Sequence, residues 1–322
     1  MTPPAPTLSN NVHIVTQDPI MLQLLATAER IAKTSITVVV TGQSGTGKEL
    51  LARYVHHHSE RRKSPFIAVN CGALHEDLLA SELFGHEKGA FTGANKAKQG
   101  LFQSANGGTL LLDEVGEMSE QMQIKLLRVI QEREVQPVGS TKTIPIDVRI
   151  IAATHRDLQA QVKAKQFRQD LYYRLNVIEL NLPPLNQRLG DAPLLAQYFL
   201  KQHTQQMQHT VDLITPKAMS ALTRYQYPGN IRELSNIIER GVALSTSNTL
   251  TEHTLPDHIH QHSAGKQPSA QLQTLAEREQ EYIGFVLEKC NNNKKKAAEI
   301  LGIDRVSLWR KLKTDNYLTR IK

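Results

Sequence analysis

A glycine-rich segment, GQSGTGK at Gly42–Lys48, has the residue types and spacing of a phosphate-binding loop. It lies between a short β-branched run and an amphipathic stretch, so we expect it to join a strand to the start of a helix. In that position backbone N–H groups wrap a phosphate, and Lys48 reaches the β- and γ-phosphates. The predicted nucleotide-binding residues are Gly42, Gln43, Ser44, Gly45, Thr46, Gly47, Lys48 and Glu49. A glycine-rich turn without a ligand is the alternative.

Two acidic residues, Asp113 and Glu114, follow the apolar run of GGTLLLDE. A carboxylate pair at the carboxyl end of a parallel strand is well placed to act together with a phosphate-binding loop that follows a neighbouring strand. We therefore assign Asp113 to a magnesium ion and Glu114 to polarising the attacking water. Because Glu49 stands where the loop usually has a hydroxyl residue, the binding of magnesium should depend on other groups and on water. An acidic pair after a strand can also be purely structural.

Three arginines are candidates for stabilising charge on a transferred phosphoryl group. Arg168 and Arg174 in FRQDLYYRL could both lie on one exposed edge of a helix and loop, and such arginines often act on a neighbouring subunit. Arg232 in YPGNIREL starts a predicted helix whose N-terminus would face the nucleotide. Taken alone, Arg168 and Arg174 are equally compatible with solvated surface positions.

The elements that must position these residues indicate an α/β domain. Five short apolar runs alternate with amphipathic stretches, which predicts a parallel five-stranded sheet covered on both faces. The runs are Thr37–Thr41, Phe66–Asn70, Thr109–Asp113, Val148–Thr154 and Val177–Leu182. After Pro183-Pro184 only helical patterns follow, so we expect a small all-helical unit with helices at Ala192–Met207, Pro216–Tyr225 and Asn230–Leu244.

The net charge of +7 is concentrated near the carboxyl end of the chain. Nine lysines or arginines and three acidic residues lie in Cys290–Lys322. This segment follows a predicted helix at Leu275–Lys289 and contains two shorter ones, Lys295–Leu301 and Arg305–Leu312. A basic unit on a nearly neutral body is typical of a nucleic-acid-binding module, although such helices can also present a solvated face.

The composition excludes a disordered, collagen-like or membrane-embedded chain, since 40% of the residues are hydrophobic and 21% are charged. The apolar runs are too short to span a bilayer and no signal peptide is evident, so we expect a cytoplasmic protein. Cys71 and Cys290 have no metal-ligand spacing and are expected to be reduced. His56–His58, expected to follow a helix, lacks a partner cluster for a metal. His258, His260 and His262 alternate in the expected linker, where they could bind adventitious metal or simply be solvated.

Five segments together resemble the central domain of bacterial enhancer-binding proteins, the NtrC-like AAA+ activators of sigma-54 RNA polymerase. They are GQSGTGKE, ELFGHEKGAFTGA, GGTLLLDE, FRQDLYYRLNV and YPGNIREL. The resemblance implies an AAA+ P-loop ATPase with a small helical lid, ATP and Mg²⁺ as cofactors, and assembly into a ring, expected to be a hexamer. In the family the GAFTGA segment is the tip of a loop that engages sigma-54, and its small residues suit a mobile loop that exposes Phe91. The implied contact residues are Gly89, Ala90, Phe91, Thr92, Gly93 and Ala94.

The same resemblance implies roles for single residues. Asn70 matches the asparagine that holds the catalytic glutamate, here Glu114, in an inactive pose until a ligand arrives. His155 occupies the first sensor position, where many members have Asn. Arg168 and Arg174 match the trans-acting arginines, and Arg232 matches the second sensor.

The carboxyl-terminal segment resembles a Fis-type helix-turn-helix that binds double-stranded enhancer DNA and forms dimers. Arg305–Lys313 would be the recognition helix in the major groove. Lys294–Lys296 would mainly bind phosphates. The implied DNA-binding residues are Arg305, Ser307, Arg310, Lys311 and Lys313.

The expected domains are a short extension (1–11), an α/β ATPase subdomain (12–183), a helical lid (184–256), a linker (257–273) and the helix-turn-helix domain (274–322). Relatives usually have an N-terminal receiver or sensing domain, and the expected extension is too short for one. We therefore expect control by expression level or by a regulatory protein acting in trans.

The sequence predicts an ATP-dependent transcriptional activator that remodels closed complexes of sigma-54 RNA polymerase holoenzyme into open complexes. One alternative is an AAA+ remodeller of another client, which would not need GAFTGA. The other is a DNA-binding repressor that uses ATP only as an assembly ligand. Such a repressor would not need Glu114, Arg168 or Arg174.

Overall fold

The computed structural model describes residues 13–91, 94–188, 190–259, 275–290 and 293–313. The chain divides into two compact units, Met1–Ser263 and Ala264–Lys322. Among the residues that the structure describes, no helix combines the length and the apolar character needed to cross a membrane.

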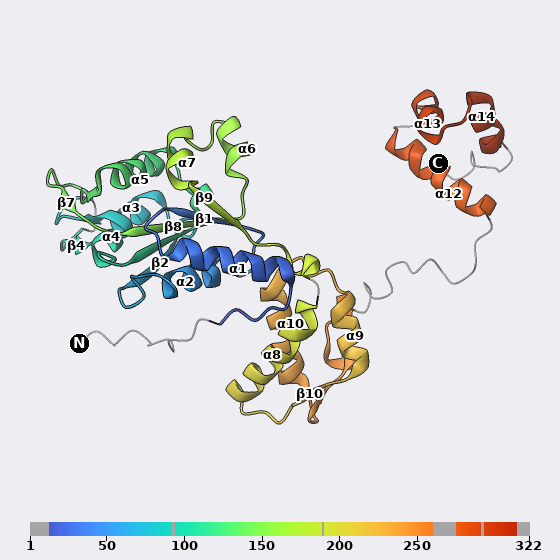
Figure 1. Ribbon diagram of the computed structural model, residues 1–322, viewed down its shortest axis with the longest axis horizontal. Coiled ribbons are helices and arrows are strands. Elements are labelled where there is room, and N and C mark those ends of the chain that lie inside the picture. Colours follow the sequence, from blue (N-terminus) through green and yellow to red (C-terminus); the bar gives the residue numbers. More distant parts are fainter. Residues whose placement is uncertain (1–12, 92–93, 189, 260–274, 291–292, 314–322) are drawn as a thin grey trace. The chain divides into compact units, whose positions relative to one another are not determined.

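The first unit is built on a five-stranded parallel sheet with helices on both faces (Figure 1). Its strands are β1 (Val38–Thr41), β2 (Phe66–Asn70), β5 (Thr109–Asp113), β8 (Arg149–Thr154) and β9 (Ile178–Asn181). Their order in the sheet is β2-β5-β8-β1-β9, and every neighbouring pair is parallel. The predicted α/β fold with five parallel strands is confirmed. The ends of the strands differ from the predicted runs by at most one residue.

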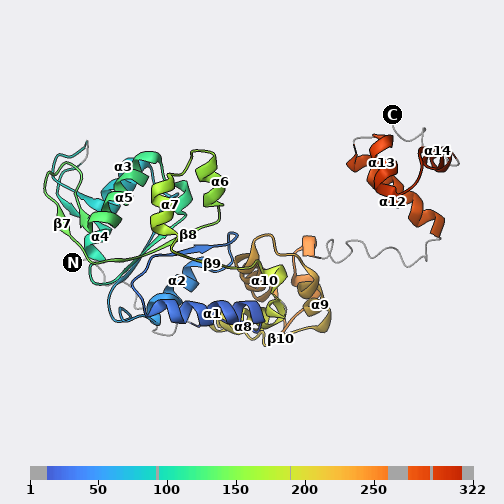
Figure 2. The same ribbon diagram turned by 45° about the horizontal axis from the view of Figure 1, so that its top comes forward.

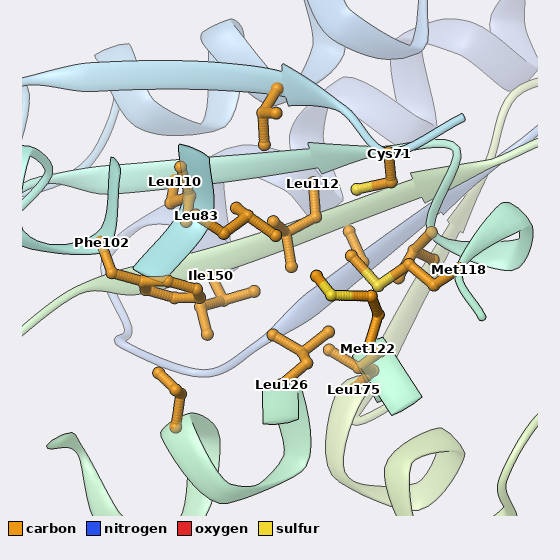
Figure 3. Close-up of a cluster of buried hydrophobic side chains, with 14 of the residues drawn as sticks. Cys71, Leu83, Phe102, Leu110, Leu112, Met118, Met122, Leu126, Ile150 and Leu175 are labelled. Atoms are coloured by element: carbon orange, nitrogen blue, oxygen red, sulfur yellow. The ribbon is translucent and has the colours of Figure 1, made fainter. Parts of the chain in front are cut away.

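Alternation along the strands divides the core between the two faces of the sheet. In β8, Ile151 and Ala153 pack with helices α1 (Pro19–Ala32) and α2 (Lys48–His57). Ile150 and Ala152 point to the opposite face, which is covered by α3 (Glu76–Phe84), α5 (Glu120–Glu132) and α7 (Gln169–Leu175). Figure 3 shows this second cluster, where Leu110 and Leu112 of β5 meet Leu83, Met122 and Leu126 of the helices.

Shorter elements complete the α/β region. They are α4 (Leu101–Ser104), α6 (Leu158–Lys163), the antiparallel pair β3 (Gly85–His86) and β4 (Lys98–Gln99), the antiparallel pair β6 (Glu134–Val135) and β7 (Ile144–Pro145), and the 3₁₀ helices η1 (Val115–Glu117) and η2 (Leu185–Gln187).

A helical lid follows the sheet within the same unit, and Figure 2 shows its helices grouped beside the end of α1. It contains α8 (Asp191–Gln206), α9 (Pro216–Arg224), α10 (Asn230–Leu244) and η3 (Glu252–Thr254). The expectation of an all-helical unit is wrong in one respect, because β10 (Leu213–Ile214) and β11 (Thr249–Leu250) form a short parallel pair. Two-residue strands are too short to give a recognisable alternation. Burial of Leu250 against Gly241 of α10 holds the second strand in place.

The folded lid extends past residue 256, where we expected the linker to begin. Residues 257–259 are helical, and Ile259 is fully buried in the lid core. Polar composition suggested a linker here, but a single apolar side chain is enough to anchor this turn to the lid.

The second unit is a three-helix domain with a small core of its own. Its helices are α12 (Leu275–Lys289), α13 (Lys294–Leu301) and α14 (Arg305–Lys313). The buried core residues are Ile283, Val286, Ala297, Ala298 and Leu308. Gly302 ends α13 with a φ of 66°, a left-handed conformation that favours glycine and turns the chain into the next helix.

The histidine run does not follow α2 as expected, because His56 and His57 form the last turn of that helix. His56 is only 8% exposed, and its Nδ1 lies 2.9 Å from Oγ1 of Thr109. Burial, together with the nearby Arg149 charge, lowers the pKa of His56 from 6.5 to about 4. The neutral ring is therefore part of the folded core.

This burial predicts acid-sensitive stability. The unfolded chain binds a proton at His56 below pH 6.5 while the folded chain resists it, so stability present above pH 6.5 is lost as the pH falls toward 4. The contribution of this group at pH 5 should be about 1 to 2 kcal/mol below that at pH 8. Urea unfolding of wild type and His56→Asn at both pH values measures it, with His58→Asn as the exposed control. The prediction would be contradicted if wild type and His56→Asn differed in free energy of unfolding by the same amount at both pH values.

Candidate functional site

The glycine-rich segment forms a loop between β1 and α2, with Lys48 as the first helical residue. Lys48 Nζ donates to the carbonyl oxygens of Gly42 and Gln43, at 3.0 and 3.4 Å. Gly45 has a φ of 78°, and a Cβ there would lie 2.3 Å from the carbonyl oxygen of Gly229 in the lid. Both the backbone conformation and the close approach of the lid therefore require glycine at this position.

The sheet order brings the acidic pair to this loop. The carboxyl ends of parallel strands lie at one edge of the sheet, and a cavity of about 400 Å³ joins the two segments there. It is lined by Ser44, Gly45, Gly47, Lys48, Glu49, Leu50, Arg53, Asp113, Glu114 and Arg232. Most of the predicted loop residues, both acidic residues and Arg232 therefore come together. Thr46 is a buried residue of the loop itself, and its Oγ1 donates to the Gln43 carbonyl oxygen.

The two carboxylates differ in electrostatics. Burial raises the pKa of Asp113, and the neighbouring charge of Glu114 raises it further against the effect of Lys48. Burial also acts to raise the pKa of Glu114, but hydrogen bonds from His155 and the Lys48 charge outweigh it and lower that pKa. Glu114 is therefore the more strongly ionised of the pair, which suits a group that must accept hydrogen bonds from water.

The donors near Asp113 suit magnesium bound together with phosphates. Among the described residues, no group of three or more His, Cys, Asp or Glu side chains could hold a metal ion. Mg²⁺ commonly uses one or two carboxylates and completes its shell with phosphate oxygens and water. A half-buried carboxylate whose pKa is raised by burial gains most from a cation, so Asp113 fits this role. Glu49 also lines the cavity, and its Oε1 accepts hydrogen bonds from Arg53.

Asn70 does not hold Glu114 in this structure, contrary to the role that the family resemblance implies. Its Oδ1 accepts a hydrogen bond of 2.9 Å from the Gly72 backbone N–H, which closes a turn at the end of β2. His155 contacts the Glu114 carboxylate instead, with 2.7 Å between His155 Nδ1 and Glu114 Oε2.

A second, larger cavity of about 1060 Å³ also reaches the phosphate-binding loop, at Thr46 and Gly47. Its apolar lining includes Ile14, Val15, Leu182, Leu195 and Ile231, and its polar lining includes Arg53 and Arg188. Sequence reasoning missed this cavity. Its lining residues come from the N-terminal segment, the phosphate-binding loop, α2 and the segment after it, and the lid helices α8 and α10, so no local motif connects them.

The start of α10 contacts the phosphate-binding loop directly. The backbone N–H groups of Ile231 and Arg232 lie 3.0 and 3.3 Å from the Gly45 carbonyl oxygen. Arg232 Nη1 donates to Ser44 Oγ at 3.1 Å, which places the predicted second-sensor arginine over the loop. A buried guanidinium, Arg188, donates to the Thr46 carbonyl oxygen at 2.9 Å and was not predicted as a site residue.

Asn230 is a further contact that sequence reasoning missed. It is fully buried, and its Nδ2 donates to Ser44 O and Gln43 Oε1 at 3.0 and 3.2 Å. Its Oδ1 accepts from the Leu185 N–H at 2.8 Å. Asn230 has a φ of 55°, a left-handed conformation that Asn tolerates better than most residues. An Asn directly after Pro228-Gly229 was therefore the sequence signal that could have indicated this position.

Asn230→Asp should therefore loosen the lid from the loop. The substitution keeps the shape but turns the donor toward Ser44 and Gln43 into an oxygen that faces two acceptors. Leaving such a buried group unpaired should cost about 3 kcal/mol of folding stability and weaken ATP binding. Urea unfolding and ATP titration test this. Asn186→Asp, which loses an exposed contact to Gln226, is the matched control and should change little.

Arg168 and Arg174 lie outside both cavities of their own subunit. Arg168 is the residue before the first turn of α7, and its side chain pairs with Asp170 at 2.7 Å and with Glu120 at 3.9 Å. Hydrogen bonding to Asp170 raises the pKa of Arg168. Arg174 is exposed in the last turn of α7 and has no ion pair within the described part of the chain. Arg174 is therefore free to contact another molecule, whereas Arg168 would first have to leave its ion pairs. The sequence motif alone does not distinguish the two.

The GAFTGA segment belongs to the connection between the paired strands β3 and β4. β3 and β4 form its base, and Val138 from the loop between β6 and β7 bonds to Gly85 and Glu87. Phe91 is not exposed as expected but half-buried, with its ring 5.0 Å from the ring of His86. Burying this ring against a neighbouring aromatic face is more favourable than leaving it in water. Gly89, Ala90 and the buried Ala94 are described, whereas Thr92 and Gly93 lie outside the described residues.

The predicted DNA-binding residues have unequal environments on α14. Arg305 and Arg310 are exposed. Ser307 is bound within the helix start, because its Oγ donates to Asp304 Oδ2 at 2.6 Å. Lys311 pairs with Glu279 of α12 at 2.9 Å. The side chain of Lys313 lies outside the described residues.

The comparisons with known proteins agree with this arrangement. The chain matches the Sigma-54 interaction domain family over residues 14–181, the AAA+ ATPase lid domain over 186–272 and the Fis family of bacterial regulatory proteins over 274–314. The transcriptional regulatory protein ZraR of Escherichia coli is 51% identical over 299 residues, which cover 93% of this chain and 68% of ZraR. The regulatory protein AtoC of the same organism is 50% identical, covering 93% of this chain and 67% of AtoC.

Solved structures show the same fold. NtrX from Brucella abortus in complex with ATP is 35% identical and superposes with a TM-score of 0.70, covering 94% of this chain and 69% of NtrX. Its complex with ADP is similar, at 34% identity and the same TM-score. The family matches span the α/β region, the lid and the three-helix domain described above. The chain therefore belongs to the AAA+ transcriptional regulators that combine a sigma-54 interaction domain with a Fis-type DNA-binding domain.

Proposed function

We propose that this regulator hydrolyses ATP with Mg²⁺ and uses the cycle to convert closed sigma-54 promoter complexes into open ones. The observation that supports it most is the meeting of Lys48, Asp113, Glu114 and Arg232 around one cavity. These are a phosphate-binding amine, a metal-binding carboxylate, a candidate base and a lid arginine. A protein that only binds ATP needs no base at this position.

The hydrolysis step follows from their placement. Lys48 leaves the loop carbonyls and binds the β- and γ-phosphates. Glu114 accepts a proton from water as the water oxygen bonds to the γ-phosphorus. The bond from that phosphorus to the β–γ bridging oxygen breaks, and ADP leaves with the electron pair. Magnesium held by Asp113 and the phosphates would neutralise negative charge in this step.

Completion of the site by a neighbouring subunit is part of the proposal. Arg174 is exposed at the end of α7 and lines neither of the two cavities at the phosphate-binding loop of its own chain. In a ring, which we propose to be a hexamer, the same edge of the next subunit would supply this cation to the γ-phosphate. Arg168 can join it after separation from Asp170 and Glu120.

We assign contact with sigma-54 to the GAFTGA segment and DNA binding to the three-helix domain. Phe91 rests on His86, so displacement of the hairpin would expose an apolar ring to sigma-54. The exposed Arg305 and Arg310 of α14 would contact enhancer DNA and tether the ring near the promoter.

ATP-dependent open-complex formation on a sigma-54 promoter tests the proposal. Wild type should hydrolyse ATP and open the promoter, whereas Phe91→Ala should hydrolyse ATP without opening it. Leu213→Ala, which removes a 58% exposed apolar side chain from the lid, is the matched control and should do both. Hydrolysis by wild type without opening, even with a DNA site supplied, would instead indicate an AAA+ remodeller of another client.

A further inference from the structure

One oxygen of the Glu114 carboxylate is held by two donors from the same residue. Oε2 lies 2.7 Å from His155 Nδ1 and 3.2 Å from the His155 backbone nitrogen. The other oxygen, Oε1, lies 3.6 Å from Lys48 Nζ. The two carboxylate oxygens therefore have different environments: within the described residues, Oε2 accepts hydrogen bonds from His155, whereas Oε1 faces the Lys48 amine.

Neighbouring strands place His155 at this oxygen. β5 and β8 pair in register, with Leu112 opposite Ala152, so the residues just beyond both strands meet at the carboxyl edge of the sheet. The backbone around His155 is held on both sides. Thr154 is fully buried and its Oγ1 accepts from the Arg156 N–H, while Arg156 also pairs with Glu117. Glu114 itself has a φ of 54°, an uncommon conformation for Glu that turns its side chain out of the strand direction.

We propose that His155 is the positioning residue of Glu114, holding Oε2 so that Oε1 becomes the oxygen that accepts the proton of the attacking water. This inference rests on the proposed ATPase function and specifies how its base is oriented. When phosphates draw Lys48 away, Oε1 loses its cation while Oε2 keeps both donors. A base oriented by a third group is a recurring arrangement in catalytic sites.

The two ring nitrogens allow a sharp test. The Nδ1 atom of His lies as many bonds from the backbone as the amide nitrogen of Asn, whereas Nε2 corresponds to the amide nitrogen of Gln. If Nδ1 positions Glu114, His155→Asn should restore function and His155→Gln should not. A histidine that instead contacted the γ-phosphate through Nε2 would give the opposite order.

Steady-state ATPase assays and ATP and ADP titrations on the full chain measure the effect. His155→Ala should lower kcat by about 10- to 100-fold, because a misplaced base loses its alignment. The affinities for ATP and ADP should stay within about twofold of wild type, since the positioning role involves no phosphate contact. His155→Asn should recover most of kcat and His155→Gln little. His58→Ala, an exposed histidine of the α2 end, is the control and should match wild type.

A double substitution separates positioning from a general effect on the fold. In the Glu114→Gln background, His155→Ala should lower kcat no further, because both changes act through one carboxylate. The inference is overturned if His155→Ala matches wild type, if it weakens ATP binding relative to ADP, or if only His155→Gln restores activity. A wild-type chain without ATPase activity would instead overturn the proposed function itself.

Discussion

Glu114→Gln should lower kcat for ATP hydrolysis by about 10²- to 10⁴-fold, the range typical of removing a general base. Gln keeps the shape of the side chain and can still accept hydrogen bonds from His155, but it cannot take the proton from water. ATP binding should persist, because Lys48 and the loop are unchanged. Single-turnover hydrolysis and a separate ATP titration distinguish the two quantities.

Glu132→Gln provides the control for that experiment. Glu132 is an exposed carboxylate at the end of α5, outside the cavity at the phosphate-binding loop, and its substitution should leave kcat unchanged. Retention of wild-type kcat by Glu114→Gln would contradict the assignment of the base. Loss of ATP affinity with an unchanged rate for bound ATP would instead assign Glu114 a role in binding.

Arg174→Ala should have the second large effect, a loss of about 10³- to 10⁵-fold in kcat if this arginine stabilises the transferred phosphoryl group. Its exposure at the end of α7 means that little folding stability should be lost. Arg168→Ala should have a smaller effect, because Arg168 already pairs with Asp170 and Glu120 in its own subunit. ATPase assays above the assembly concentration measure both.

Mixing two inactive variants tests whether the site is shared between subunits. Arg174→Ala subunits retain Glu114, and Glu114→Gln subunits retain Arg174. In mixed rings some sites would therefore contain both groups and regain activity. Arg128→Ala, an exposed arginine of α5, should be active alone and is the matched control. A mixture as inactive as its parts would contradict action in trans.

Much of the fold and part of the site could be predicted from local patterns. The apolar runs at Phe66–Asn70 and Thr109–Asp113 coincide with β2 and β5, because buried parallel strands need continuous apolar residues. The glycine-lysine spacing predicted the loop, because backbone geometry at successive residues determines whether N–H groups can surround a phosphate. The helix α14 was likewise predicted from its amphipathic pattern and from the turn at Gly302.

Other features depended on contacts that no local pattern reports. Phe91 was expected to be exposed but packs on His86, and the lid contains the short pair β10–β11. Asn230 of the lid donates to Ser44 of the phosphate-binding loop, and the larger cavity combines residues from the N-terminal segment to α10. These contacts depend on the order of the strands in the sheet and on how the lid packs against the phosphate-binding loop.

The residue that holds Glu114 shows this division most clearly. The sequence by itself determined the chemistry available, namely a phosphate-binding lysine, two carboxylates and a histidine in a sensor position, because those depend on residue types and short spacings. Only the tertiary structure decided that His155 rather than Asn70 contacts the carboxylate. β5 lies between β2 and β8, so Asn70 at the end of β2 and His155 just after β8 both lie beside it. Local backbone turns, with Asn70 bonded to Gly72, then decide which side chain reaches Glu114.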